Sequence, residues 1–197
     1  MLAVIILAQK LVSGCKEACL FTAGRGKFSN VMNARIRKTK LFFEQKDEFL
    51  TILKNDLTLF SNYCKDNNIT PYVRLNGTSD ISWEKYGIFS QFSELNFYDY
   101  TKVHNRKVSQ YKNYHLTYSR SEESTEQDLI KALDSDMNIA VVFGDTVPAV
   151  WKVKDRTLTV IDGDKDDLRI KDKSSVIVGL IAKGKAKQDT SGFVVYG

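Results

Sequence analysis

Two cysteines near the amino terminus have a spacing that suits metal binding. Cys15 and Cys19 are four residues apart, about one helical turn, so a helix would place both thiolates on one face. A structural zinc takes four ligands, so ligands from among Cys64, His104 and His115 would have to complete the set. A three-cysteine iron–sulfur cluster needs another nearby cysteine, but Thr22 stands three residues after Cys19. The pair permits a zinc or iron–sulfur cofactor without the spacing that would identify either.

Positive charge is concentrated in the same part of the chain. Residues 1–43 carry eight lysines and arginines against one acid, a net +7, whereas the other 154 residues carry 21 basic and 23 acidic side chains. The overall net charge of +5 and the pI near 9.0 therefore describe one segment and not the whole protein.

The basic loop-helix segment at 22–43 has the order of a phosphate site. Glycines in its loop let the backbone approach an anion, and the N–H groups of the helix that follows, capped by Ser29 or Asn30, favour negative charge. The side chains expected to hold the phosphate of a nucleotide or nucleic acid are Arg25, Lys27, Arg35 and Lys38. The residues expected to turn inward are Val31, Met32, Ile36 and Phe43. The alternative is a solvated basic face that keeps the protein soluble.

A second group of polar side chains follows the predicted strands. Because ligands of parallel α/β folds bind at the carboxyl ends of strands, we expect a pocket lined by Arg74, Asn76, Asp80, Asp99, Lys102, Arg120, Asp162 and Lys183. Arg74 lies within an apolar strand, where a charge must be paired or face a wet cavity. Its expected partner is Asp80, Asp99 or Asp162. A purely structural ion pair at the end of the sheet is the alternative.

The apolar periodicity predicts the elements that position these residues. Residues 46–66 have apolar positions at three- and four-residue spacing, typical of an amphipathic helix. Short apolar runs predict strands at 71–75, 95–98, 114–118, 139–143, 158–161 and 176–181. Short helices are expected at 82–92, 102–111 and 124–135, the last capped by Ser124.

Strands that alternate with helices imply a parallel sheet. Residues 2–7 would add a strand, and residues 151–155 and 157–161 would form a hairpin. We therefore predict one α/β domain over residues 1–197, a partial (β/α) barrel with a mostly parallel sheet. An open doubly wound α/β sheet is the alternative.

The composition excludes several classes of protein. With 43% hydrophobic and 27% charged residues, the chain is not disordered, and no run reaches the roughly 18 apolar residues of a membrane-spanning helix. The apolar run at 2–8 has no positive charge before it, so we read it as a buried strand and not as a signal peptide. Three cysteines favour a reducing cytoplasm over a disulfide framework. No P-loop, GxGxxG, HExxH or GxSxG pattern occurs, which leaves open whether the chain is an enzyme.

Several motifs together resemble an uncharacterised protein family of bacteriophages and mobile elements. They are GCKEACL at 14–20, TAGRG at 22–26, RIRKT at 35–39, RLNGTSD at 74–80, FYDYTK at 97–102, SRS at 119–121, DGD at 162–164 and GLIAKG at 179–184. The resemblance implies a partial barrel distantly similar to radical S-adenosylmethionine enzymes, whose cluster is held by three cysteines near the first strand. The family carries a further cysteine upstream of the Gly-Cys pair, and residues 8–12 of this sequence contain none.

Three functions are compatible with these observations. The first is a phage-type protein, in the host cytoplasm and not in a membrane, that binds a nucleotide or nucleic acid through phosphate at the strand ends. The second is a non-catalytic interaction protein acting on a host factor, such as a defence component. The third is a metal- or cluster-assisted enzyme using Cys15 and Cys19.

Overall fold

The structure, a computed structural model, describes residues 28–77 and 79–196. The predicted strand at 2–7 and the candidate residues Cys15, Cys19, Arg25 and Lys27 lie outside this range. The elements, in chain order, are α2 (Ser29–Glu44), α3 (Lys46–Asp66), β1 (Tyr72–Val73), η3 (Trp83–Tyr86), α4 (Ile88–Gln91), β2 (Asn96–Thr101), β3 (Tyr114–Ser119), α5 (Glu126–Asp134), β4 (Asn138–Phe143), β5 (Val150–Val153), β6 (Arg156–Asp162), η4 (Arg169–Lys171), β7 (Ile177–Ile181), η5 (Gly184–Gln188) and β8 (Val194–Val195).

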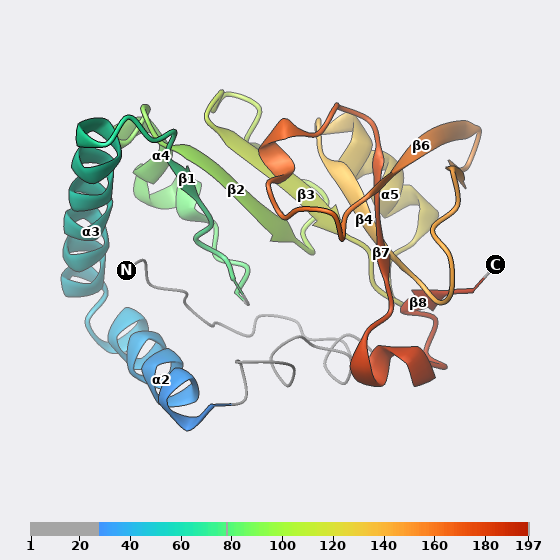
Figure 1. Cartoon of the computed structure of the whole chain (residues 1–197), viewed down its shortest axis with the longest axis horizontal. Coiled ribbons are helices and arrows are strands. Elements are labelled where there is room, and N and C mark those ends of the chain that lie inside the picture. The colour runs from blue at the N-terminus through green and yellow to red at the C-terminus, as the bar shows by residue number, and fades with distance from the viewer. Residues whose placement is uncertain (1–27, 78, 197) are drawn as a thin grey trace.

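One eight-stranded sheet organises the molecule. Its strand order is β1-β2-β3-β4-β7-β6-β5, and β8 pairs with β4. Every pairing among the described strands is parallel except the β5–β6 hairpin, and no pairing joins β1 to β5 to close these strands into a barrel. Figure 1 shows α2 and α3 beyond the β1 end of the sheet and β6 near the opposite end. The prediction of a single α/β domain with a mostly parallel sheet is confirmed.

Most predicted elements of the described residues are present. The predicted helix at 82–92 is divided into η3 and α4, η4 and η5 were not predicted, and three further differences follow. No helix forms in 102–111, where turns lead from β2 to β3. Helix α5 is capped by Thr125 and not by Ser124, because the Thr125 hydroxyl accepts from the Asp128 N–H while the Asp128 carboxylate accepts from the Thr125 N–H. Strand β8 is two residues long, too short to leave a periodic signal.

Alternation of side chains gives the sheet two chemically different faces. Phe97, Asp99 and Thr101 of β2 point to one face, which we call the α4 face because the Phe89 ring of α4 lies 5.1 Å from the Phe97 ring. Tyr98 and Tyr100 point to the other face. We call it the η4 face because η4 packs against β2 and β3 there.

Helices α2 and α3 form an arm at the edge of the sheet. Phe42 is the buried side chain of α2, with its ring 5.4 Å from that of Phe49 and 6.0 Å from that of Trp83. Met32, Ile36 and Phe43, expected to face inward, are exposed. That expectation was wrong because the periodicity identifies an apolar stripe but not what covers it.

Within the part of the chain that the structure describes, none of the helices combines the length and the apolar character needed to cross a membrane.

Candidate functional site

Arg74 lies directly after β1 and turns toward the η4 face. Its Nη1 donates to Asp167 Oδ2 at 2.8 Å, and its guanidinium carbon lies 4.7 Å from the centre of the Tyr100 ring. The partner of Arg74 is therefore Asp167, and the prediction of Asp80, Asp99 or Asp162 as its partner was wrong. Asp99 points to the α4 face, whereas the loop before η4 brings Asp167 over Tyr100 and Arg74.

A second arginine is buried over the same strands. Arg169 of η4 is 2% exposed. Its Nη1 lies 3.1 Å from Asp172 Oδ2, and its Nη2 donates to the backbone oxygen of Asp166. Burial raises the pKa of Asp172 above the ordinary value, and the charge of Arg169 opposes that rise. Two guanidinium groups are thus held on one face of the sheet, each beside a carboxylate.

The other polar side chains of this face keep their protons or stay neutral. Burial raises the pKa of Tyr98, and raises that of Tyr100 to about 12, although the charges of Arg74 and Arg169 oppose both shifts. The pKa of His115 is lowered, first by burial and then by Arg169. Near neutral pH this face therefore has two phenol groups, a neutral imidazole and two guanidinium groups, together with the aspartates that pair with the two arginines.

Six atoms on the η4 face are buried without a hydrogen-bond partner among the described residues, and two of them, Arg169 Nη1 and Asp172 Oδ2, form the ion pair described above. The other four have no partner of either kind among those residues. They are Arg74 Nε, Arg169 Nε, His115 Nε2 and Thr117 Oγ1. His115 and Thr117 are two residues apart on β3, so both side chains point to the same face. The strand register places them beside Tyr98 and Tyr100 of β2. Buried polar atoms are normally paired, so this group has unused capacity for hydrogen bonding.

The α4 face carries a buried polar network in which three of the expected residues take part. Asn76 donates through its N–H to Asp99 Oδ1 at 2.7 Å and through Nδ2 to Asp99 Oδ2 at 3.3 Å. Asn76 Oδ1 accepts from Ser79 and from the indole N–H of Trp83. Complete burial raises the pKa of Asp99 from 3.8 to about 7, and the Asn76 N–H and nearby arginines oppose the rise.

Arg106 connects the rest of this network. Its side chain forms a fork onto Glu84, reaches Asp80 at 3.4 Å, and donates to the Tyr114 hydroxyl at 3.3 Å. Tyr114 in turn donates to Asp99 Oδ2 at 3.3 Å. Arg106 is 5% exposed, so a buried cation is matched to two acids. Asn76, Asp80 and Asp99 are thereby committed to internal contacts.

Lys102 and Arg120 both contact Phe193, the residue directly before β8. Arg120 Nη1 donates to the carbonyls of Gly192 at 2.9 Å and Phe193 at 3.0 Å. Lys102 Nζ lies 5.9 Å from the centre of the Phe193 ring, and its N–H donates to Asp80. Burial lowers the pKa of Arg120. These two cations therefore lie at the carboxyl ends of β2 and β3, as expected.

Asp162 and Lys183 are joined through a third residue at the ends of β6 and β7. Asp164 Oδ1 accepts from Lys183 Nζ at 2.6 Å, and the Asp164 N–H donates to Asp162 Oδ1 at 2.9 Å. The turn between the two acids needs Gly163, because a Cβ there would lie 2.5 Å from Val178 Cγ1. The eight expected pocket residues are thus divided among Arg74, the Asp99 network, the Lys102–Arg120 pair and this turn.

The described part of the basic segment lies on α2. Lys38 is partly buried, which lowers its pKa, while Asp56 of α3 and Arg37 act on it in opposite directions. Arg37 and Lys40 are exposed. The assignment of Arg35 and Lys38 to a phosphate stays a prediction, as does that of Arg25 and Lys27, which lie outside the described residues.

The family of the chain follows from its sequence as a whole. The family model described as Gene product 88 matches residues 10–197, which is nearly the entire chain. The chain belongs to the gene product 88 family. This confirms the resemblance to a phage-type family. No curated protein and no solved structure gives a significant match, so the likeness of the family to radical S-adenosylmethionine enzymes stays a prediction.

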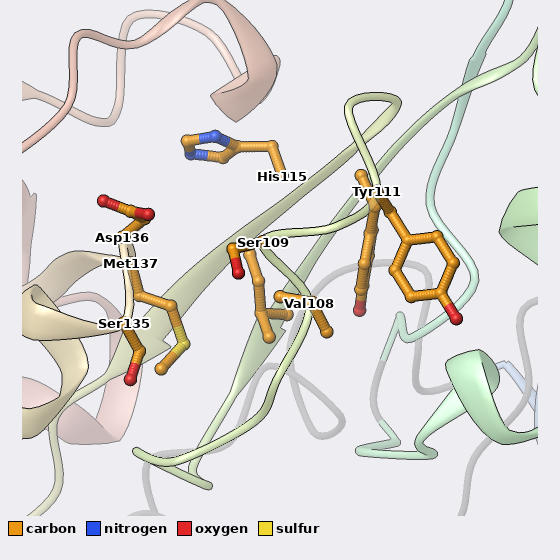
Figure 2. Close-up of a pocket in the computed structure, with 9 residues that line it drawn as sticks. Val108, Ser109, Tyr111, His115, Ser135, Asp136 and Met137 are labelled. Atoms are coloured by element: carbon orange, nitrogen blue, oxygen red, sulfur yellow. The ribbon is translucent and has the colours of Figure 1, made fainter.

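A cavity of about 160 Å³ lies in this gene product 88 protein away from the expected position. It is lined at the amino end of β3 by Tyr114, His115 and Leu116, and from neighbouring segments by Val108, Ser109, Tyr111, Ser135, Asp136 and Met137. Figure 2 shows the His115 imidazole directed away from Val108 and Ser109. The cavity shares His115 with the η4-face group, but its other lining residues belong neither to that group nor to the expected pocket.

The hypothesis of a metal site at Cys15 and Cys19 stays a prediction. Among residues 28–77 and 79–196, no group of three or more histidine, cysteine or acidic side chains is placed to hold a metal ion. Cys64 is a buried free thiol. Cys15 and Cys19 lie outside the described residues, so their zinc or iron–sulfur assignment in this family member stays a prediction.

Sequence reasoning missed the two buried arginines. Arg106 lies in the segment expected to be a helix, and Arg169 lies in a polar stretch between β6 and β7. Neither has a periodic apolar context. The available signal was indirect: Tyr98 and Tyr100 both belong to the FYDYTK motif, and aromatic residues on one side of a strand are suited to packing against a guanidinium.

Proposed function

We propose that the chain binds a phosphate-bearing ligand, a nucleotide or a nucleic acid, on the η4 face beside the carboxyl end of β1. The observation that carries this proposal is the group of orphaned buried atoms at Arg74, Arg169, His115 and Thr117. A buried donor without a partner costs about 1–3 kcal/mol. A ligand that supplies acceptors recovers part of that cost.

The chemistry of the group favours an anion. A guanidinium has donors and no acceptor, and its planar fork matches phosphate oxygens. The Thr117 hydroxyl can donate as well. Because the pKa of Tyr100 is about 12, its hydroxyl keeps its proton near neutral pH and adds no negative charge beside the phosphate.

Asp167 is the group that phosphate would replace. Its side chain is 61% exposed while it holds Arg74 Nη1. Exposed ion pairs are worth about 0–1 kcal/mol, so exchange of this carboxylate for a phosphate oxygen has a small cost. Arg74 would keep its stacking contact with Tyr100 throughout the exchange.

A longer ligand would reach the expected cations at the strand ends. Lys102 and Arg120 lie at the carboxyl ends of β2 and β3, where Lys102 Nζ lies 5.9 Å from the centre of the Phe193 ring and Arg120 donates to the Phe193 carbonyl. Aromatic rings combined with basic side chains are typical of single-strand binding. The remaining basic residues, Arg25, Lys27, Arg35 and Lys38, are proposed contacts for such a ligand.

The test is calorimetric titration of the full chain with inorganic phosphate, a nucleoside monophosphate and the matching nucleoside. Arg74→Gln should weaken binding of the two phosphate compounds by about tenfold or more, because a hydrogen bond to a charged group contributes about 1.5–3 kcal/mol. Asp167→Asn should strengthen binding, since it removes the competing negative charge. Affinity should also fall as salt concentration rises.

Arg156→Gln is the matched control. Arg156 donates to Asp134 at 2.8 Å in an exposed pair on the hairpin strand β6. Arg156→Gln therefore removes one guanidinium from an aspartate pair, as Arg74→Gln does, but at a position away from the η4 face. Binding in this variant should equal that of the wild type. Failure of both phosphate compounds to bind, or unchanged binding in Arg74→Gln, would reject the proposal.

A further inference from the structure

Helix α2 presents an apolar stripe to solvent. Met32, Ile36 and Phe43 are 37%, 48% and 61% exposed. Their spacings of four and seven residues place them on one side of the helix. Phe42 is the residue that α2 buries in the core, so within residues 28–77 and 79–196 this stripe adds no buried side chain to the core.

Helix α3 presents a second stripe of the same kind. Ile52, Leu59 and Tyr63 are 44%, 68% and 59% exposed, again at spacings of seven and four residues. The core-facing residues of the same helix are Phe49, Leu53, Leu57 and Cys64. Helix α3 is therefore apolar on two sides, which a helix packed on one core does not require. Exposed apolar patches of this kind mark interaction sites.

The charges beside the two stripes are of opposite sign. Residues 29–43 of α2 contain four basic side chains and no acid, and Arg37 and Lys40 among them are exposed. On α3, Glu48 and Asp56 lie four residues before and after Ile52, and Asp66 lies seven residues after Leu59, so all three acids share the side of the stripe.

We propose that these stripes bind a second copy of this chain, with α2 of each copy lying against α3 of the other. A two-fold symmetric pair forms this contact twice, because each copy supplies both a basic and an acidic stripe. A nucleic acid or an anionic membrane would be repelled by Glu48, Asp56 and Asp66 at the α3 stripe. The inference uses none of the η4-face residues that carry the proposed function, so either can fail without the other. The two compete only for α2, whose Arg35 and Lys38 are secondary contacts in the proposed function.

Sedimentation equilibrium of the full chain over a range of concentrations tests this proposal. The wild type should show a reversible monomer–dimer equilibrium. Ile36→Glu and Leu59→Glu should each raise the dissociation constant by roughly tenfold or more, because each places an uncompensated charge in a buried contact. Val150→Glu is the matched control, since Val150 of β5 is 54% exposed but lies away from the arm.

Charge reversal tests the pairing of the two helices. A variant with Arg37→Glu and Lys40→Glu and a variant with Glu48→Lys and Asp66→Lys should each be mainly monomeric. Mixed together they should form a heterodimer, because the reversed α2 meets a reversed α3 while the native helices still match. Circular dichroism confirms that each variant is folded.

Three results would overturn the inference. They are a wild-type chain that is monomeric at every concentration, dimerisation unchanged by Ile36→Glu and Leu59→Glu, and failure of the charge-reversed variants to associate on mixing. A monomer that instead co-sediments with anionic vesicles or binds a labelled oligonucleotide through α2 would also overturn it.

Discussion

The two faces of the central sheet treat buried polar groups in opposite ways. On the α4 face, Asp99 accepts from Asn76 and Tyr114, and Arg106 is held by Glu84 and Asp80. On the η4 face, the guanidinium of Arg169 and the hydroxyl of Thr117 are as deeply buried, yet they keep atoms without partners among the described residues. The two clusters face opposite sides of the same strands, so depth alone does not explain the difference.

The difference separates groups that hold the fold from groups that are available to a ligand. A satisfied buried network rigidifies the elements it joins, and here it ties the β1 loop, η3 and the 102–113 loop to β2 and β3. An incompletely satisfied cluster stabilises little and retains donors for another molecule. Variants on the α4 face should therefore alter stability, and variants on the η4 face should alter binding.

Replacement of Arg106 should have the largest effect. Arg106→Met removes the cation and leaves Glu84 and Asp80 facing each other in a nearly buried site. Removal of one partner of a buried ion pair typically costs about 3–5 kcal/mol. Urea unfolding monitored by circular dichroism should show a loss of that size in the free energy of unfolding.

The control for this prediction is the exposed pair of Arg156 and Asp134. Arg156→Met should lower the free energy of unfolding by less than about 1 kcal/mol, because ion pairs exposed to solvent contribute little to stability. Equal losses in Arg106→Met and Arg156→Met would mean that the Arg106 network does not hold the fold more strongly than a surface contact.

Asp99 should make the stability of the protein depend on pH. Its pKa rises from 3.8 to about 7 on burial, so between these values the folded chain keeps a proton that the unfolded chain has released. The free energy of unfolding should therefore decrease as pH rises from about 4 to about 7, by up to about 4 kcal/mol, and then level off. Denaturant unfolding at a series of pH values measures this.

Asp99→Asn supplies the comparison, because an amide does not titrate. The difference in stability between wild type and variant should shrink or change sign as pH rises from about 4 to about 7. A difference that is the same at pH 5 and pH 8 would show that the Asp99 carboxyl does not change its protonation on folding.

The sequence predicted the framework better than the contacts. Helix α3 matched its predicted bounds because its apolar spacing is regular, and runs such as those of β4 and β7 identify strands that are covered on both faces. Both are local patterns. They require no knowledge of what packs against them.

The contacts depend on loops, which carry no periodic signal. Arg169 is buried only because the stretch after β6 folds back over β2 and β3, and a polar loop of that composition is equally compatible with full solvation. The pairing of Arg74 with Asp167 spans 93 positions in sequence. Arg74 was found because a charge beside an apolar strand needs a partner, but its partner could not be identified from spacing.

Two buried threonines on adjacent strands give the smallest and most direct test of the contrast. Thr101 faces the α4 face, where its hydroxyl donates to Asp80 at 3.0 Å and accepts from the Val103 N–H at 3.0 Å. Thr117 faces the η4 face with its hydroxyl unpartnered. Thr101→Val should lower the free energy of unfolding by about 1–2 kcal/mol, since it leaves the Asp80 carboxylate and the Val103 N–H each without one hydrogen-bond partner. Thr117→Val should be neutral or stabilising by up to about 1 kcal/mol, because valine buries a methyl group where an unsatisfied hydroxyl was.

The same pair distinguishes a ligand site from a merely imperfect core. If the Thr117 hydroxyl serves phosphate, Thr117→Val should weaken phosphate binding severalfold while the chain without ligand is at least as stable as the wild type. Thr101→Val should lower stability and leave phosphate affinity unchanged under folded conditions. Calorimetric titration and urea unfolding of both variants measure the two effects separately. Unchanged phosphate binding in Thr117→Val would remove Thr117 from the site, and a loss of stability there equal to that in Thr101→Val would contradict the contrast between the faces.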